Sequence, residues 1–236
     1  MPSTAARKLS SSAGLVTEQL VASGRRSVLE ASVMRRFVVV GQRATASPDF
    51  LLVDLPGTSG RLDVLLRCVR AALLVSHGVR RDTVVYLVLL GGPRAPRTLR
   101  VEGEAVRFLR PDERHLAKTV QKALATPSDG EGFVPIRAGI ALADGGIEAV
   151  LADLGPMTPY VLEEGATDVR EVPFDAPGPV FFLGDHLGFD DVTRARLASV
   201  SATAVGVGPV SVHADDAVVI VCNELDRRDA RETRAT

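Results

Sequence analysis

Acidic residues and histidines gather in two short segments near the carboxy-terminal end of the sequence, FFLGDHLGFDD (181–191) and SVHADDA (211–217). The side chains that could bind a divalent metal are His186, Asp190, Asp191, His213, Asp215 and Asp216. Their spacing matches no established ligand template, and aspartates are favoured in the first turn of a helix because the helix dipole places positive charge there. We therefore expect the aspartates to begin two helices, and we expect no metal.

Other familiar chemistries find few matching residues. The pattern Gly206-x-Gly208-x-x-Ser211 nearly matches the dinucleotide-binding fingerprint. That fingerprint needs a further strand with an acidic residue about 20 positions later, and the remaining chain is too short to supply it. No serine lies in a G-x-S-x-G nucleophile elbow. Cys68 and Cys222 lie in apolar surroundings, so we expect buried free thiols in a reducing compartment.

The segment DLPGTSGRLDVLLRCVRAALLVSHGVRRD (54–82) carries charge beside an apolar helical stripe. Its apolar positions at helical spacing are Leu62, Leu65, Leu66, Val69 and Leu73, and its charged positions on the polar side include Arg61, Asp63, Arg67 and Arg70. Two interpretations remain open. The charges could form a solvated helix face, or guanidinium groups could bind phosphates while a carboxylate handles a proton.

Composition narrows the class of protein. The chain has 236 residues, 46% of them hydrophobic, which suits one large or two small domains, and its net charge of −1 implies no global attraction to nucleic acid or to an anionic membrane. No apolar run approaches the roughly 20 residues that cross a bilayer, so we expect a cytoplasmic protein without a membrane partner. Residues 1–33 are rich in Ser, Ala and Arg; we interpret them as a mobile extension rather than a transit peptide, with residues 34–236 forming the domain.

From Met34 onward, predicted strands and helices alternate. Strands are expected at 37–40, 84–90, 160–162 and 180–183, helices within 54–82 and at 110–125, 146–154, 190–200 and 213–228, and a hairpin around Gly103. The alternation predicts an α/β fold with a mostly parallel sheet flanked by helices. Ligands bind at the carboxyl ends of strands in such sheets, where Gly184 and the loop 206–211 are expected, and this favours a nucleotide-like cofactor.

Four segments of the chain resemble one known family. They are DLPGTSGRLDVLLRCVRAALLVSHGVRRD, PDERHLAKTVQKAL, VFFLGDHLGF and VGPVSVHADDAVVIVCNELDRR, and they occur in order between Met34 and Arg228. They are similar to the TrmY family, archaeal-type tRNA methyltransferases that methylate nitrogen 1 of pseudouridine 54 in the T loop. The resemblance implies a SPOUT fold, whose carboxy-terminal part forms a trefoil knot, and a homodimer that binds tRNA.

The resemblance also implies where S-adenosylmethionine binds. The implied cofactor residues are Leu162, Gly184, Val207, Gly208, Pro209, Val210, Ser211, Val212 and Ala217. Gly184 is then expected to avoid a collision with the cofactor, whereas Asp185 and His186 are expected to brace the loop. Many members have a cysteine where this chain has Ala217, so no cysteine nucleophile is expected.

Candidate residues for the reaction and for RNA follow from its chemistry. Nitrogen 1 of pseudouridine is a poor nucleophile until its proton leaves, so a residue must help with that proton. Asp63 is the candidate for this role, with Arg61 orienting a phosphate or the developing anion. Candidates for RNA backbone contacts are Arg67, Arg70, Arg80 and Arg137. The alternatives are methylation of ribosomal pseudouridine by a SPOUT enzyme, a SPOUT module that binds RNA without catalysis, and a metal-dependent hydrolase.

Overall fold

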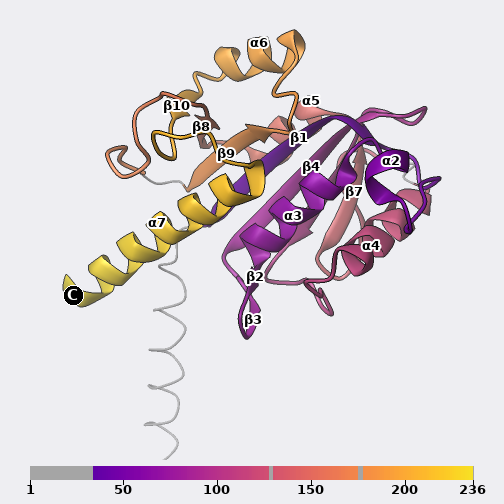
Figure 1. The fold of residues 1–236 in the computed structure, drawn as a ribbon, viewed down its shortest axis with the longest axis horizontal. Helices are drawn as coiled ribbons and strands as arrows, with labels where there is room; N and C mark the ends of the chain where they lie inside the picture. Colours follow the sequence, from indigo (N-terminus) through magenta and orange to yellow (C-terminus); the bar gives the residue numbers. More distant parts are fainter. Residues whose placement is uncertain (1–33, 128–129, 175–177, 236) are drawn as a thin grey trace, which may run out of the picture. The chain divides into compact units, whose positions relative to one another are not determined.

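The fold is built on an eight-stranded sheet with helices on both faces (Figure 1). The structure is a computed structural model and describes residues 34–127, 130–174 and 178–235. The predicted mobile extension, residues 1–33, lies outside the described residues. The first strand, β1 (Arg35–Thr45), begins one residue after Met34.

The sheet is parallel at its centre and on one side, and antiparallel on the other. Its order is β10 (Thr203–Val205), β8 (Thr158–Leu162), β9 (Pro179–Gly184), β1, β4 (Thr83–Gly91), β5 (Arg97–Glu102), β7 (Ile140–Asp144) and β6 (Val134–Arg137). The pairs from β10 through β4 are parallel, and those from β4 through β6 are antiparallel. The expected α/β fold with a mostly parallel sheet is therefore confirmed.

The central strands are buried on both faces, which explains their uninterrupted apolar sequence. In β1, Phe37 and Val39 pack into one core while Val38 and Val40 pack into the other. The first core is covered by α3 (Leu62–Leu73), α4 (Glu113–Ala125) and α7 (Ala214–Ala235). The second is covered by α5 (Ile147–Leu154) and α6 (Asp191–Ser199). Figure 1 shows α3, α4 and α7 together on the near face of the sheet.

Aspartates begin several helices, as the sequence predicts. Asp112 accepts a hydrogen bond from the amide of His115 at 2.7 Å at the start of α4, and Asp190 accepts one from the amide of Thr193 at 2.8 Å at the start of α6. Asp215 and Asp216 lie in the first turn of α7. These side chains satisfy amide groups or the dipole at helix N-termini, which is the ordinary use of aspartate there.

The hairpin predicted around Gly103 is wrong. Residues 97–102 form a single strand, β5, which pairs with β4 on one side and with β7 on the other. Gly103 ends this strand where a Cβ atom would lie 1.8 Å from the carbonyl oxygen of Arg80, so only glycine fits. The partner strand β7 lies almost 40 residues along the chain, and a pairing at that distance leaves no local signal. Strands β6, β7 and β10 were not predicted.

The segment after β8 and the end of α7 are joined by several contacts. Arg228 of α7 donates hydrogen bonds to the carbonyl oxygens of Val169 and Val172, both at 2.8 Å, and lies over the ring of Phe174. The amide of Val169 donates to the carbonyl of Gly206, just after β10, at 2.7 Å. The trefoil knot expected for this part of the chain stays a prediction.

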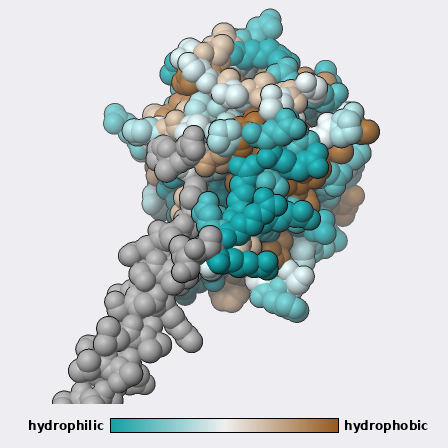
Figure 2. All heavy atoms as spheres, turned by 90° about the vertical axis from the view of Figure 1, so that its left-hand side faces the viewer, coloured by the Kyte–Doolittle hydropathy of each residue, from teal (hydrophilic) through white to brown (hydrophobic). Residues whose placement is uncertain are grey.

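The surface around α7 is mainly polar. Viewed from the left-hand side of Figure 1, toward which the carboxy-terminal end of α7 points, hydrophilic side chains form a broad patch with hydrophobic ones scattered around it (Figure 2). The last turns of α7 have the sequence NELDRRDARETR, which accounts for polar character there. No helix in the described part of the chain is long and apolar enough to cross a membrane.

Candidate functional site

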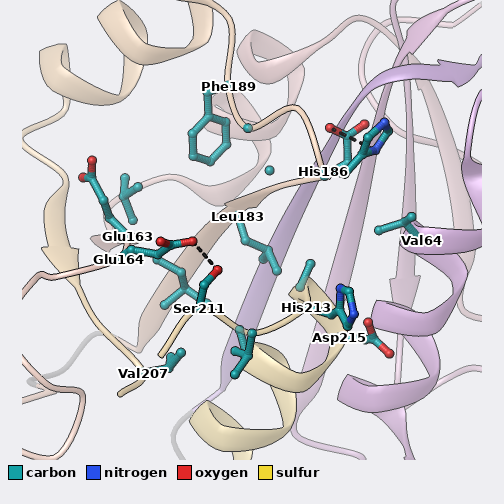
Figure 3. Close-up of a pocket in the computed structure, with 18 of the residues that line it drawn as sticks. Val64, Glu163, Glu164, Leu183, His186, Phe189, Val207, Ser211, His213 and Asp215 are labelled. Atoms are coloured by element: carbon teal, nitrogen blue, oxygen red, sulfur yellow. Dashed lines mark hydrogen bonds and ion pairs between the residues drawn. The ribbon is translucent and has the colours of Figure 1, made fainter. Parts of the chain in front are cut away.

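A cavity of about 690 Å³ lies at the carboxyl ends of β8 and β9, between the first turns of α3 and α7 (Figure 3). Its position is the one at which parallel α/β sheets bind ligands, and its volume is that of a small-molecule site. The predicted cofactor residues that line it are Leu162, Gly184, Val207, Gly208, Val210, Ser211, Val212 and Ala217. Pro209 belongs to the same loop but is not among the lining residues.

The loop after β9 is held by Asp185. Its carboxylate accepts hydrogen bonds from the amide of Gln42 at 2.9 Å and from the amide of Leu187 at 2.8 Å, and the side chain is fully buried. The amide of Asp185 itself donates to the carbonyl of Val40. The prediction that Asp185 braces this loop is confirmed.

The loop itself requires a glycine at position 184. A Cβ atom at this position would lie 2.6 Å from the backbone of Gly188, in the turn that Asp185 closes. Gly188 has a φ of 70°, so the turn depends on two glycines whose backbones touch. A side chain at Gly184 would therefore collide within the loop that forms the cavity wall, and the expected collision with a cofactor stays a prediction.

Two glutamates that sequence reasoning missed follow β8 directly. Glu163 and Glu164 both line the cavity, and the hydroxyl of Ser211 donates a hydrogen bond to the carboxylate of Glu164. This bond joins the segment after β8 to the loop before α7 within the cavity lining, and Figure 3 draws it as a dashed line. In the sequence, the signal that could have identified Glu163 and Glu164 as site residues is their position immediately after the strand TPYVL.

The remaining wall is partly apolar and partly cationic. Leu183 and Phe189 face the cavity in Figure 3, with Val161 also among its lining residues. Arg194, whose Nε donates to the carbonyl of Phe189 at 3.2 Å, adds a positive charge at the α6 side. A ligand with a flat apolar part and polar ends fits such a wall.

Asp63 and Arg61 lie together at the α3 side of the cavity, but only Arg61 lines it. Asp63 is 3% exposed and binds two arginines: Nε of Arg61 lies 3.0 Å from Oδ1, and Nη1 of Arg67 lies 3.0 Å from Oδ2. Burial acts to raise the pKa of Asp63, but the hydrogen bonds and charges of Arg61 and Arg67 outweigh it, so the pKa lies below the ordinary value. A carboxylate in this state is a weak proton acceptor.

Arg61 adopts a left-handed backbone, with φ 69°, immediately before α3. This conformation is unfavourable for a residue with a side chain, and it is often found at functional sites. Gly60 shares it, and a Cβ atom on Gly60 would lie 1.8 Å from the carbonyl of Arg43. The tight turn therefore places the Arg61 guanidinium at the cavity and against Asp63.

Arg67 connects Asp63 to the first turn of α7. Its Nε lies 3.6 Å from Oδ2 of Asp215, which lines the cavity beside His213 (Figure 3). The row Asp63–Arg67–Asp215 thus links the helix that carries Arg61 to the loop that carries the predicted cofactor residues. Because two nitrogens of the Arg67 guanidinium, Nη1 and Nε, face carboxylates, this geometry favours a positioning role for Arg67 over an RNA backbone contact.

The other arginines predicted to contact RNA lie away from the cavity. Arg80 donates two hydrogen bonds of 2.7 Å to the Asp226 carboxylate, so its guanidinium is engaged within the fold. Arg70 on α3 and Arg137 on β6 are exposed. Arg137 donates to the carbonyl of Arg107 at 3.1 Å. Their roles in RNA binding stay predictions.

Neither metal chemistry nor cysteine chemistry is supported by the described residues. Within 34–127, 130–174 and 178–235, no group of three or more His, Cys, Asp or Glu side chains could hold a metal ion. Cys68 and Cys222 are both buried free thiols, as predicted. Burial raises the pKa of Cys222 to about 11 and that of Cys68 further still, which keeps both protonated.

Comparisons with known proteins agree with this geometry. Residues 34–230 match the family described as "Putative SAM-dependent RNA methyltransferase". The tRNA (pseudouridine(54)-N(1))-methyltransferase of Methanosarcina mazei is 40% identical over 197 residues, covering 84% of this chain and 93% of that protein. The enzyme of the same description from Halobacterium salinarum is 42% identical over 195 residues, covering 82% of this chain and 96% of that protein.

A solved structure shares the fold. The crystal structure of Archaeoglobus fulgidus Nep1 bound to S-adenosylhomocysteine matches with a TM-score of 0.59 and 16% identity, covering 83% of this chain and 99% of that chain. At this identity the match speaks for the fold alone. The family model and the sequence relatives confirm the family resemblance: this chain belongs to the SAM-dependent RNA methyltransferase family that includes the archaeal tRNA (pseudouridine(54)-N(1))-methyltransferases.

Proposed function

We propose that this protein transfers a methyl group from S-adenosylmethionine to nitrogen 1 of pseudouridine 54 in tRNA. The observation that carries the proposal is the identity of about 40% to enzymes of that description over 93% or more of their length. The cavity at the carboxyl ends of β8 and β9 supplies a site of matching size and position. Nearly all of the residues that the family resemblance assigns to the cofactor line it.

The residues that would hold S-adenosylmethionine fit its chemistry. Leu162, Leu183 and Val207 give an apolar surface for a flat ring, and the glycine-containing loop 206–211 leaves backbone amides and carbonyls accessible. Glu163 and Glu164 supply negative charge for hydroxyl groups or an ammonium group. The cofactor supplies a methyl group on a positively charged sulfur, which is already a good electrophile.

The protein then has to position the base and help its proton to leave. Arg61 reaches the cavity and can stabilise the negative charge that develops on the pyrimidine ring as nitrogen 1 loses its proton to solvent. Asp63 holds Arg61 and Arg67 in place through charged hydrogen bonds. We therefore propose Arg61 as the catalytic residue and Asp63 as its positioning residue, in place of Asp63 as the base.

The protein's partners are tRNA and, we propose, a second copy of the chain. A dimer of the SPOUT type would bring the RNA-binding surface of one copy to the cavity of the other. The exposed side chains of Val219 on α7, and of Val210 and Val212, which also line the cavity, support an interface there because they form apolar surface at this end of α7. A tRNA substrate also supports the cytoplasmic location expected from the sequence.

The test is methylation of a defined tRNA. The protein is incubated with S-adenosylmethionine and tRNA carrying pseudouridine 54, and the nucleosides are analysed by mass spectrometry. We expect N1-methylpseudouridine at position 54. A matched transcript with uridine 54 should give no product, because nitrogen 1 of uridine is bonded to the ribose and cannot accept a methyl group. Methylation of ribosomal RNA but not of tRNA would instead favour the alternative substrate.

A further inference from the structure

Phe108 has the greatest exposure among the exposed large hydrophobic residues of the described chain, at 83%. Its backbone has a φ of 59°, in the left-handed region that bulky residues rarely adopt. An exposed aromatic ring and a strained backbone both cost free energy. Because the ring is exposed, packing within the fold does not offset either cost. Such an outlier suggests a function for the ring.

The turn that presents Phe108 is fixed on both sides. A ring nitrogen of His115, Nε2, lies 3.1 Å from the carbonyl oxygen of Phe108. Arg137 donates a hydrogen bond of 3.1 Å to the carbonyl of the preceding residue, Arg107. These bonds come from α4 and from β6, so two separate elements hold the backbone that carries the exposed ring.

Exposed cations lie on the segments next to Phe108 and on the two elements that bind its backbone. The exposed cations on this turn, on the first two turns of α4 and on β6 are Arg107, Arg110, Arg114, Lys118 and Arg137, and none of them takes part in an ion pair found among the described residues. The carboxylates nearby in sequence are Glu104, Asp112 and Glu113, of which Asp112 is engaged as the helix cap of α4. We call Phe108 and the five cations the Phe108 patch.

The Phe108 patch lies at the edge of the sheet opposite the cavity. β5 runs antiparallel to β4, and the amide of Gly103, at the end of β5, bonds to Thr83 at the start of β4. The cavity lies at the carboxyl ends of strands that run parallel to β4. The nine residues of β4 span about 27 Å, so a nucleotide at Phe108 cannot be the one in the cavity of the same subunit.

We propose that Phe108 is a stacking platform for an unpaired base of the bound RNA, and that the cations of the Phe108 patch contact the phosphates beside that base. Proteins that bind unpaired nucleotides combine aromatic rings with arginine and lysine in this way. A protein partner would also cover the ring, but unpaired cations at this density favour a polyanion. The inference rests on the proposed function in that tRNA is the RNA.

Substitution of Phe108 tests the stacking contact. Phe108→Ala should weaken binding of tRNA by about 5- to 150-fold, the range for loss of one base–aromatic stack, while Phe108→Trp retains the affinity. Phe108→Gly should weaken binding equally without lowering the melting temperature, because glycine accepts the positive φ. Val192→Ala, at another exposed apolar side chain, is the matched control and should bind normally. Unchanged affinity in Phe108→Ala overturns the proposal.

Tryptophan fluorescence gives a direct readout, because the chain has no tryptophan of its own. In Phe108→Trp, added tRNA should quench the emission through stacking, whereas the emission of Val192→Trp should change little. Light scattering without RNA should give the same mass for Phe108→Ala and the wild type; a lower mass would assign the ring to a protein interface and overturn the proposal.

The two proposals can fail separately. If the wild-type protein does not methylate tRNA but Phe108→Trp is still quenched by it, the proposed reaction is wrong and the stacking platform stands. If methylation is normal and neither quenching nor loss of affinity occurs, the platform is wrong and the proposed function stands.

Discussion

Asp63 is a residue whose burial changes its role. On a solvated helix face, the pair between Asp63 and Arg67 would contribute only a few tenths of a kcal/mol. In the structure Asp63 is buried and bound to both Arg61 and Arg67, and its pKa is lowered. A carboxylate with a lowered pKa holds cations well and accepts protons poorly.

The Asp63→Asn variant should therefore lose rate through Arg61. Asparagine keeps the shape but removes the charge, so Arg61 is held less firmly, and we expect the single-turnover rate to fall by about 10²-fold or more. The affinity for S-adenosylmethionine should stay nearly unchanged, because Asp63 does not line the cavity. Single-turnover kinetics at saturating cofactor and tRNA measure the rate, and calorimetry measures the affinity.

The pH profile of the same variant separates positioning from base catalysis. If Asp63 only positions Arg61, the residual activity of Asp63→Asn should rise with pH in the same way as the activity of the wild type. The reason is that nitrogen 1 of pseudouridine must lose its proton in both proteins. Arg61→Ala is the matched variant, and its rate should fall as far as that of Asp63→Asn. Combining the two substitutions in one protein should lower the rate no further, because Asp63 acts through Arg61. A rate close to that of wild-type protein in Asp63→Asn would contradict this role.

At the scale of elements, a charged cluster attaches α7 to the start of β1. Arg35 is 3% exposed and contacts three carboxylates: Asp82 at 3.1 Å, Asp226 at 2.6 Å and Asp229 at 2.7 Å. Asp226 also binds Arg80. Burial acts to raise the pKa of Asp226, but hydrogen bonds from Arg80 and Arg35 outweigh it and lower the pKa.

This cluster should make stability depend on pH. The pKa of Asp226 is lower in the folded state than in the unfolded state. The stabilisation that the Asp226 carboxylate provides is therefore fully present at pH values above its unfolded-state pKa of about 3.9, and it is lost as the pH falls through its folded-state pKa. Asp226→Asn should lower the free energy of unfolding at pH 7 by about 1 kcal/mol, a modest value since the side chain is partly exposed. Near pH 3, about a unit below the unfolded pKa, the difference from the wild type should shrink.

Urea unfolding at the two pH values measures this difference. Asp49→Asn, which removes an exposed carboxylate elsewhere, is the control and should change stability little at either pH. A difference for Asp226→Asn that stays constant across the acid range would show that its charge does not stabilise the fold through Arg35 and Arg80.

The elements that could be predicted are those with a local cause. The run Phe37 to Val40 predicts a buried strand, and Asp190 predicts a helix start; both are confirmed. Gly103 misled because its constraint is a contact with Arg80, more than 20 residues away. The strand β10 has only three residues, and its pairing with β8 leaves no periodicity to detect.

The candidate site was predictable in part for the same reason. Glycine-rich loops after strands indicate the carboxyl edge of a sheet, and the family resemblance assigned residues that line the cavity. The contacts between distant segments left no sequence signal: the bond between Ser211 and Glu164, the collision that a side chain at Gly184 would make with Gly188, and the row from Asp63 through Arg67 to Asp215.

At the scale of the whole molecule, residues 34–230 carry the family match and the relatives align over almost their full length with about 197 residues of this chain. The cavity, the Asp63 cluster, the Arg35 cluster and the Phe108 patch all lie within those residues. We therefore expect the proposed reaction and the proposed dimer to require no residue before Met34.

A chain that starts at Met34 should thus retain both properties. We expect its methyl-transfer rate on tRNA to equal that of the full chain within about twofold, and its mass by light scattering to remain that of a dimer of the shortened chain. The melting temperature should also be unchanged, because the first strand begins at Arg35 and its ion pairs with Asp82, Asp226 and Asp229 are kept. Deleting three residues further, through Arg36, is the matched control: it removes Arg35 and should destabilise the fold by leaving those three carboxylates close together without their shared cation. Loss of activity or of the dimer in the chain that starts at Met34 would assign a role in assembly or catalysis to residues 1–33.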